Sequence, residues 1–371
     1  MSNRHKELFK DFEPHSKVEW INITKEQLKG EDVFSKFSWH PEPDLTILPY
    51  YDFSDIHFKK NNFDNRLLHT DSQNKSARHW YNFQLINCSD TEAAHEQSIL
   101  AIEQGATGLI FNLESIENID FDQLLEGINT AKYSLSFRIN EQWERHLDNY
   151  VRFIDKKKDN THKIRGFILN NSQTLQADKL TKYSLDHIHT LEIKVDEHLS
   201  YTDSIAKALL QVIEVIENIK DESIESIFKK LFFNIPLGTK YFEEICRTQT
   251  VRRLTFQVAS AYGCKDFLPE DLYLLCTSPP WITEAYNPQS NLLKSTTAAM
   301  AAIIGGCNGL LLLPSDSKSP LLKRIALNTS TILQEEAYLN ATNDPVAGSY
   351  YLENMIDQMS QTAWQKFQNA L

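Results

Sequence analysis

The sequence predicts an α/β fold, a (β/α)8 or TIM barrel with an irregular amino-terminal arm. Eight short apolar runs, rich in β-branched and aromatic residues, follow residue 77 and alternate with segments of helical period. Strands buried on both faces of a parallel sheet have this composition. The count of eight, and the absence of a glycine-rich nucleotide turn after the first run, favour a barrel over a doubly wound sheet. A length of 371 residues suits one such barrel or two smaller domains.

The expected strands and helices follow in order. The strand candidates are 79–86, 108–113, 133–139, 164–170, 190–195, 230–237, 271–277 and 309–314. The clearest helix candidates between them are 91–105, 204–219, 240–263 and 291–306. The first begins after Asp90, a good N-cap, and ends at Gly105. The second carries one apolar stripe, formed by Ile205, Leu209, Val212, Ile213 and Ile216.

Residues 1–76 form the predicted arm, with a short helix at its start, and residues 77–371 form the barrel with its carboxy-terminal helices. Three prolines between residues 41 and 49 oppose regular helix in the arm. The arm is rich in aromatic side chains: Phe9, Phe12, Trp20, Phe34, Phe37, Trp39, Tyr50, Tyr51 and Phe53. Such an arm either covers its own barrel or binds a partner, and we expect it to be a clasp for a partner.

Composition excludes several classes of protein. With 41% hydrophobic residues the chain can build a large core, whereas a net charge of −12 argues against binding nucleic acid or an anionic membrane. The five cysteines contain no C-x-x-C pair, so we expect reduced thiols in a cytoplasmic protein and no zinc site. The amino terminus does not resemble a signal peptide, and the longest apolar stretch is too interrupted to span a membrane.

Few residues suggest chemistry on their own. The common nucleotide, hydrolase and metalloprotease motifs are absent from the sequence. His187 and His189 could share a strand face and bind a metal, but no third ligand is evident nearby. His198 follows two carboxylates after the fifth strand, at the end where barrel enzymes place catalytic groups. Thr277, Ser278 and Asp316 lie at the same expected rim, where turn formation is the simpler role for each.

The carboxy-terminal third closely resembles the adenosylcobalamin-dependent acyl-CoA mutases, above all the methylmalonyl-CoA mutase family. That family carries R-I-A-R-N-T, then E-E, then D-P-x-x-G-S-Y-x-x-E. The matching residues here are Arg324, Ile325, Ala326, Asn328, Thr329, Glu335, Glu336, Asp344, Pro345, Gly348, Ser349, Tyr350 and Glu353. The stretch 287–316 resembles N-x-x-R-T-x-x-A-x-A-A-x-x-G-G, with Asn291 retained and Lys294 where Arg is usual. Trp80 and Gln84 match a W-x-x-x-Q pair in the family's first strand.

The chain also departs from this family. Its cobalamin domain follows the G-S-Y motif and supplies a histidine from D-x-H-x-x-G, whereas only residues 354–371 follow Glu353 here. Two near matches, 55–60 and 196–201, precede the motif and lack the glycine. The loops that contact substrate are eroded, with no tyrosine in 65–76 and with Lys230 in place of a substrate-contacting arginine. We therefore expect no cobalamin, metal or catalytic residue in this chain.

The resemblance implies a small, non-catalytic, structural or regulatory subunit of a heterodimeric methylmalonyl-CoA mutase. Its partner would be the catalytic large subunit, which would carry adenosylcobalamin and interconvert methylmalonyl-CoA and succinyl-CoA. Without that partner, the same surface of the arm would serve for self-association. Two alternatives remain open: the substrate-binding barrel of a split mutase, and a free-standing acyl-CoA-binding protein. The remnants of a pocket would be Gln84, His198, Lys230, Thr277, Ser278, Asn291 and Asp316.

The barrel axis supplies a sharper expectation. In active members of the family the CoA tail threads the barrel past small hydroxyl-bearing side chains. Here bulky residues occupy the strand candidates: Phe83, Phe111, Phe137, Phe167, Phe232, Phe233 and the run 310–313. About half of the side chains of a strand point into a barrel. We therefore expect several of these residues to plug the axis.

Overall fold

The computed structural model describes residues 15–55, 78–139, 143–156, 164–170, 185, 188–281 and 288–371. Nine parallel strands form one nearly closed barrel, in the order β7-β6-β5-β4-β3-β11-β10-β9-β8. The strands are β3 (Tyr81–Asn87), β4 (Gly108–Asn112), β5 (Ser134–Ile139), β6 (Gly166–Asn170), β7 (Ile188–His189), β8 (Leu191–Lys194), β9 (Leu231–Pro236), β10 (Tyr273–Ser278) and β11 (Gly309–Leu312). Only Thr190 separates β7, which pairs with β6, from β8, which pairs with β9. The two pieces thus occupy one of eight strand positions, and the predicted α/β barrel is confirmed.

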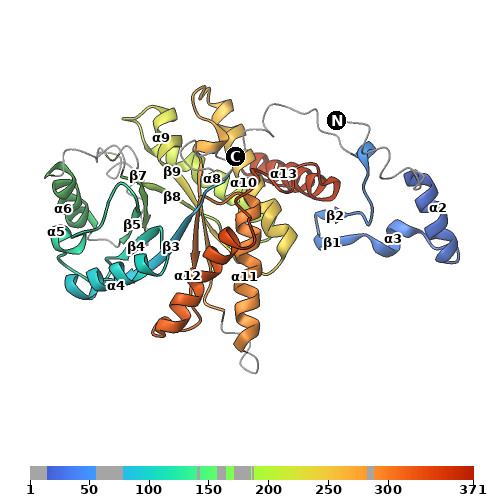
Figure 1. Ribbon diagram of the computed structural model, residues 1–371. Coiled ribbons are helices and arrows are strands. Elements are labelled where there is room, and N and C mark those ends of the chain that lie inside the picture. Colours follow the sequence, from blue (N-terminus) through green and yellow to red (C-terminus); the bar gives the residue numbers. More distant parts are fainter. Residues whose placement is uncertain are drawn as a thin grey trace, which may run out of the picture.

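Helices surround this barrel (Figure 1). They are α4 (Thr91–Glu103), α5 (Phe121–Leu124), α6 (Trp143–Lys156), α8 (Tyr201–Asn218), α9 (Ile224–Lys230), α10 (Tyr241–Ala261), α11 (Pro288–Gly305), α12 (Pro320–Glu335) and α13 (Tyr350–Ala370), with a short 3-10 turn η3 (Pro269–Asp271). Asp90 caps α4 by accepting the Ala93 N–H, and Gly105 ends that segment with φ +98°. The predicted stripe on α8 is buried except for Ile213, which packs at its margin. The helix prediction therefore holds for all four segments.

The barrel interior is packed with aromatic rings. Phe167 lies 5.1 Å from Phe83 and 5.1 Å from Phe232 between ring centroids, and these three strands supply the centre of one buried cluster. Ile110, Leu169, Leu275 and Leu311 complete that cluster. The remaining phenylalanines of the expectation point outward: Phe111 and Phe137 pack in one outer cluster and Phe233 in another. The expected plug is confirmed, with three of the six rings inside.

Glycine makes room for this plug. A Cβ atom on Gly309 would lie 2.6 Å from the Phe83 ring and 2.7 Å from the Tyr273 hydroxyl, and one on Gly108 would also collide with Phe83. Neither distance is tolerable for a real Cβ contact. Both glycines flank β3 in the sheet, because Gly309 pairs with Tyr81 and Gly108 with Phe83. The Phe83 ring therefore fills space that its neighbouring strands leave empty.

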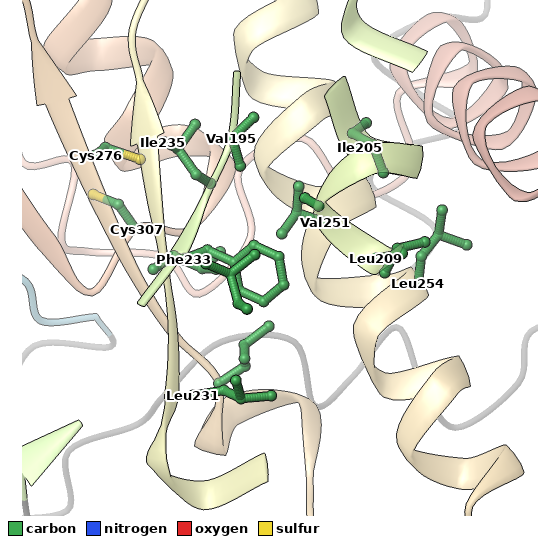
Figure 2. Close-up of a cluster of buried hydrophobic side chains, with 14 of the residues drawn as sticks. Val195, Ile205, Leu209, Leu231, Phe233, Ile235, Val251, Leu254, Cys276 and Cys307 are labelled. Atoms are coloured by element: carbon green, nitrogen blue, oxygen red, sulfur yellow. The ribbon is translucent and has the colours of Figure 1, made fainter. Parts of the chain in front are cut away.

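Two separate cores lie between the strands and the helices. The larger one joins β8–β11 to α8, α10, α11 and α13, and Figure 2 shows part of it around Phe233 and Leu209. The smaller one joins β3–β6 to α4, α5 and α6. Among the described residues, only the aromatic layer inside the barrel connects β3 and β6 directly to β9 across the axis. The barrel thus has two outer cores and one shared inner core.

The described part of the arm is more regular than expected. It contains α2 (Lys17–Gln27), α3 (Val33–Phe37), a hairpin of β1 (Trp39–Glu42) and β2 (Leu45–Ile47), and a 3-10 turn η1 (Phe53–Asp55). The prolines that argued against helix lie in or next to this hairpin, whose turn is residues 43–44. In Figure 1 the hairpin lies beside α13, while α2 and α3 extend away from the barrel. Phe9, Phe12 and residues 56–76 lie outside the described residues.

The hairpin belongs to the barrel's core. Leu45 and Ile47 are fully buried in the larger outer cluster. Lys366 of α13 reaches Asp44 of the hairpin and Asp203 of α8, at 2.8 Å each. Glu42 accepts the N–H groups of Tyr201 and Thr202 at the start of α8. Residues 42–47 are therefore fixed to this chain's own barrel.

Candidate functional site

Barrel enzymes carry their active sites at the carboxyl ends of the strands. A group of polar side chains lies at this end of the barrel, which we call the mouth. Glu192 of β8, Asn234 of β9 and Thr277 of β10 lie on neighbouring strands near their carboxyl ends. Strand alternation turns each of them inward, above the aromatic layer that begins with Phe232. This arrangement places a small polar network over an apolar plug.

Hydrogen bonds close this network. Glu192 Oε2 accepts the backbone N–H of Asn170 at 2.8 Å, and Oε1 accepts the Asn234 amide at 2.9 Å. The Thr277 hydroxyl donates to the Asn234 carbonyl oxygen at 3.3 Å. Lys194 lies 3.8 Å from Glu192 and donates to the Asn170 carbonyl at 2.6 Å. Both oxygens of the carboxylate are thus engaged by this chain's own donors.

Burial dominates the chemistry of Glu192. Loss of water raises the pKa of its carboxyl above the ordinary value, and the nearby Lys194 charge and the two hydrogen bonds oppose that rise. A buried carboxylate whose oxygens are both satisfied orients its neighbours. It is poorly placed to attack or deprotonate a substrate, because its acceptor sites are occupied. Among the described residues, the network of Glu192, Asn234 and Thr277 is therefore a fixed polar structure without an exposed reactive group.

The sequence candidates do not converge on this mouth. Only Thr277 belongs to the network. Gln84 shares the outward side of β3 with Asn82, which donates to the Leu327 carbonyl of α12. Ser278 accepts the Leu313 N–H and ties β10 to the chain beyond β11. Lys230 ends α9 at the opposite end of the barrel and pairs with Glu222 at 2.6 Å.

Two further candidates lie in exposed turns, and one lines a groove. The His198 side chain is 87% exposed, and its backbone N–H is held by Asp196. Asp316 caps the turn at Lys318. Asn291 of α11 is buried and lines a groove between α11, the segment that follows β11, and α12. Other residues that line this groove include Trp281, Ser295, Leu313 and Thr329.

The histidine pair expected as a possible metal site is only half visible, because His187 lies outside the described residues. His189 is half-buried at the amino-terminal end of the barrel, 5.0 Å from the Tyr273 ring between ring centroids. Loss of water lowers its pKa to about 4. Within the described part of the chain no group of three metal-binding side chains occurs, and no helix there has the length and apolarity to cross a membrane.

Sequence reasoning missed Glu192 and Asn234. A signal for Glu192 was present, since Glu192 and Lys194 are charged residues two apart in an otherwise apolar run. Such spacing puts both on one face of a strand, and a charge on the inner face of a barrel strand needs partners. Asn234 gave a weaker signal in its apolar strand.

Comparison with known proteins shows which family this barrel resembles. A family model for methylmalonyl-CoA mutase matches residues 188–370. A methylmalonyl-CoA mutase small subunit from Porphyromonas gingivalis is 24% identical over 99% of this chain and 64% of its own length. Residues 188–370 belong to the methylmalonyl-CoA mutase family. A small subunit from Streptomyces virginiae is 31% identical over 45% of the chain, and a methylmalonyl-CoA mutase from Escherichia coli is 33% identical over 38%.

These relatives are longer than the chain. It spans less than two thirds of each of them, 28% of the Streptomyces protein and 20% of the Escherichia coli mutase. Among solved structures, a dihydropteroate synthase from Coxiella burnetii is 15% identical over 68% of this chain and 93% of its own, with a TM-score of 0.37. That weak likeness adds nothing to the strand topology described above.

The mutase-family motif builds the turn that leads into α13. Ser349 caps α13 by accepting the Leu352 N–H, and Glu353 accepts the Gly348 N–H at 3.1 Å. Gly348 has φ +85°, which explains a glycine at that position. Asp344 accepts the Val346 N–H at 3.0 Å. Four other motif residues lie at or near the surface of α12 and α13: Arg324, Asn328, Glu335 and Tyr350.

Proposed function

We propose that this chain is the small, non-catalytic subunit of a heterodimeric methylmalonyl-CoA mutase, which interconverts methylmalonyl-CoA and succinyl-CoA. Its role is structural or regulatory, and the large subunit carries both adenosylcobalamin and the chemistry. The proposal includes a cytoplasmic location, in keeping with five buried cysteines that are all free thiols. It rests on the small-subunit relatives and on the interior of the barrel.

The aromatic plug is the observation that carries this proposal. The resemblance implies that active barrels of the family hold the CoA thioester along the axis. Here Phe83, Phe167 and Phe232 occupy that axis and are at most 2% exposed. Their removal from the axis would require the burial of about three aromatic side chains elsewhere, each worth roughly 1.5–3 kcal/mol. An acyl-CoA tail therefore has no low-energy route through this interior.

The same observation weighs against both alternatives. A split mutase and a free-standing acyl-CoA-binding protein each need an accessible axis, whichever polypeptide carries the cofactor. The closed network at Glu192 and the exposed position of His198 add to this, because neither offers a polar group to a thioester. A non-catalytic subunit needs only the outer surface of the barrel.

Activity assays test the proposal directly. We expect the isolated chain not to isomerise methylmalonyl-CoA, with or without an added cobalamin-binding protein, and calorimetry to detect no binding of acyl-CoA. Co-expression with a catalytic large subunit should give a stable, active complex. Turnover by the chain with only a cobalamin-binding protein would establish the split enzyme. Stoichiometric acyl-CoA binding without turnover would establish the binding protein.

Cofactor binding is tested by spectroscopy. We propose that this chain binds no adenosylcobalamin, since its D-x-H matches lack the glycine of the family motif. Titration with the cofactor should leave the visible spectrum of the cofactor unchanged. A stoichiometric spectral shift would overturn this part of the proposal.

The outer half of the arm is the proposed contact with the large subunit. Helix α2 has no buried residue, although it carries apolar side chains. Exposed large apolar side chains of the described arm are Val18, Ile23, Phe37, Trp39 and Phe53, the last of them 78% exposed. Interfaces between permanently associated subunits are apolar and are dominated by aromatic side chains. The anchored hairpin would hold this surface in a fixed position on the barrel.

The anchored hairpin also decides how the arm should be tested. Deletion of residues 1–53 would remove Leu45 and Ile47 from the core, so it would confuse unfolding with lost binding. Deletion of residues 1–37 removes α2 and α3 and leaves the hairpin. We expect the shorter deletion to fold and to lose its affinity for the large subunit. An undiminished affinity would show that the arm is not the clasp.

Point variants refine this test. Ile23→Asp and Phe53→Asp should each weaken association at least tenfold, because each buries a charge at the proposed interface. The matched control is Leu100→Asp, a similarly exposed apolar position on α4, which Figure 1 shows on the side of the barrel away from the arm. An equal loss with the control would mean that association does not depend on the arm.

A further inference from the structure

We propose that the large subunit of the proposed function, on which this inference rests, binds one continuous surface that runs from the arm onto an aromatic patch of the barrel. The aromatic patch consists of six residues from three segments: Tyr51 and Phe53 of the arm, Tyr241 and Phe242 at the start of α10, and Tyr350 and Tyr351 at the start of α13. Helix α13 lies on the side of the barrel next to the arm (Figure 1). One partner can therefore cover both the arm and the patch.

Ring contacts join the aromatic patch across its three segments. The Tyr351 ring lies 5.7 Å from the Phe242 ring and 6.0 Å from the Tyr51 ring, between centroids. Phe242 also contacts Tyr241, at 5.4 Å between ring centroids. Aromatic pairs at these separations attract each other. Tyr51 and Tyr351 pack in addition against the larger outer core, so the barrel holds the patch in a fixed position.

The segment that carries Tyr51 and Phe53 also holds helix α2. Trp20 of α2 stacks on Tyr50, with 4.8 Å between the ring centroids. Lys17 of α2 forms an ion pair with Asp55 at 2.6 Å, and both side chains are mostly buried. The exposed face of α2 is thus connected directly to the patch. The arm has a second attachment here, in addition to the hairpin.

The outer side chains of the patch are open to solvent. Phe53 is 78% exposed, Phe242 44% and Tyr350 37%. They come from three elements, and Val18 and Ile23 of the neighbouring α2 are exposed as well. Exposed apolar side chains that gather on adjoining elements are typical of an interaction site, whereas single ones are ordinary.

The arm alone is too small for a permanent interface. Such an interface buries about 2,000 Å² or more in total, which is about 1,000 Å² on each partner. Helix α2 has 11 residues and α3 has 5. One face of a helix of their combined length, about 24 Å long and about 10 Å wide, offers roughly 400 Å². The large subunit therefore needs further surface beside the arm, and the aromatic patch supplies it.

A second copy of this chain suits the patch less well than the large subunit. The net charge of −12 on each copy opposes the approach of two identical chains. Contact between unlike subunits is free of this restriction. Self-association through the patch is accordingly a competing outcome in the experiments.

The affinity of the full-length chain for the large subunit tests this inference. We expect Phe242→Asp to weaken association at least about tenfold, because it places a charge in an apolar interface. Phe242→Leu should retain most of the affinity. The matched control is Tyr262→Asp, because Tyr262 is 39% exposed and follows the other end of α10, about 30 Å from Phe242. The control should change the affinity less than about twofold.

The outcomes separate this inference from the proposed function. If Ile23→Asp weakens the complex and Phe242→Asp does not, the large subunit contacts the arm only, and the inference is wrong while the subunit role stands. An equal loss with Tyr262→Asp would also contradict a local contact. If the wild type forms no complex with a large subunit, both the inference and the proposed function are wrong.

Hydroxyl-radical footprinting gives a second measurement that needs no variant. Formation of the wild-type complex should reduce the oxidation of Phe53, Phe242 and Tyr350 about threefold or more, because an interface excludes water from its centre. Oxidation of Tyr262 should stay the same. Protection of the patch in the chain alone, lost when the large subunit binds, would show self-association and would overturn the inference.

Discussion

Phe167 is the residue of the aromatic plug whose truncation we expect to lower the free energy of unfolding most. Its ring is fully buried and lies near the rings of Phe83, Phe232 and Tyr273. Phe167→Ala should reduce the free energy of unfolding by about 3–5 kcal/mol, because truncation leaves a cavity that a closed barrel cannot collapse. Urea denaturation measures the loss. Phe242→Ala, at a position 44% exposed on α10, should change stability by less than about 0.5 kcal/mol.

His189 makes stability depend on pH. Burial lowers its pKa to about 4 in the folded chain, whereas the unfolded chain binds a proton near pH 6.5. The stability that neutral His189 allows is present above pH 6.5 and is lost as the pH falls toward 4, by up to about 3 kcal/mol. His189→Gln should flatten this dependence between pH 7 and pH 4.5. His198→Gln, in an exposed turn, is the control and should leave the slope unchanged.

The hairpin β1–β2 is held to the barrel through a cap that it supplies to helix α8. Glu42 accepts the Tyr201 and Thr202 N–H groups, so a residue of the arm satisfies the amino terminus of α8. Glu42→Ala should cost about 1–2 kcal/mol and should speed amide exchange in residues 39–47. Glu31→Ala removes an exposed ion pair with Lys36 on the same arm and should cost well under 1 kcal/mol. Equal effects of the two would show that the cap carries no special weight.

Sequence alone located the strands well, because buried parallel strands are apolar throughout and stand out from their surroundings. It could not say which of two adjacent phenylalanines faces the axis, since Phe232 and Phe233 differ only in the register of their strand. From the sequence, the prolines of the arm predicted an irregular structure, although they lie in or next to a hairpin that is stabilised by helices distant in the sequence. Of the pocket candidates only Thr277 joined the mouth network.

At the scale of the molecule, the two outer cores divide the barrel near residue 188, where the match to the family model also begins. The arm does not follow this division between the two halves of the barrel. It enters from the amino-terminal half, yet Leu45 and Ile47 are buried with α8 and α13 of the other half. Tyr51 likewise meets Tyr351 of α13, 6.0 Å away between ring centroids. One half of the chain thus reaches across and inserts into the core of the other.

Because of this arrangement, we expect the barrel to assemble even when the chain is divided into two polypeptides. Two co-expressed fragments, 1–170 and 188–371, would each keep one outer core, while the aromatic layer and the hairpin would become the surfaces that rejoin them. We expect the fragments to co-purify as a stoichiometric pair, and omission of residues 1–55 from the first to abolish recovery. Independent elution of intact fragments would contradict this. The hairpin β1–β2, which fixes the proposed partner-binding surface on the barrel, would then also hold the two fragments of a divided barrel together.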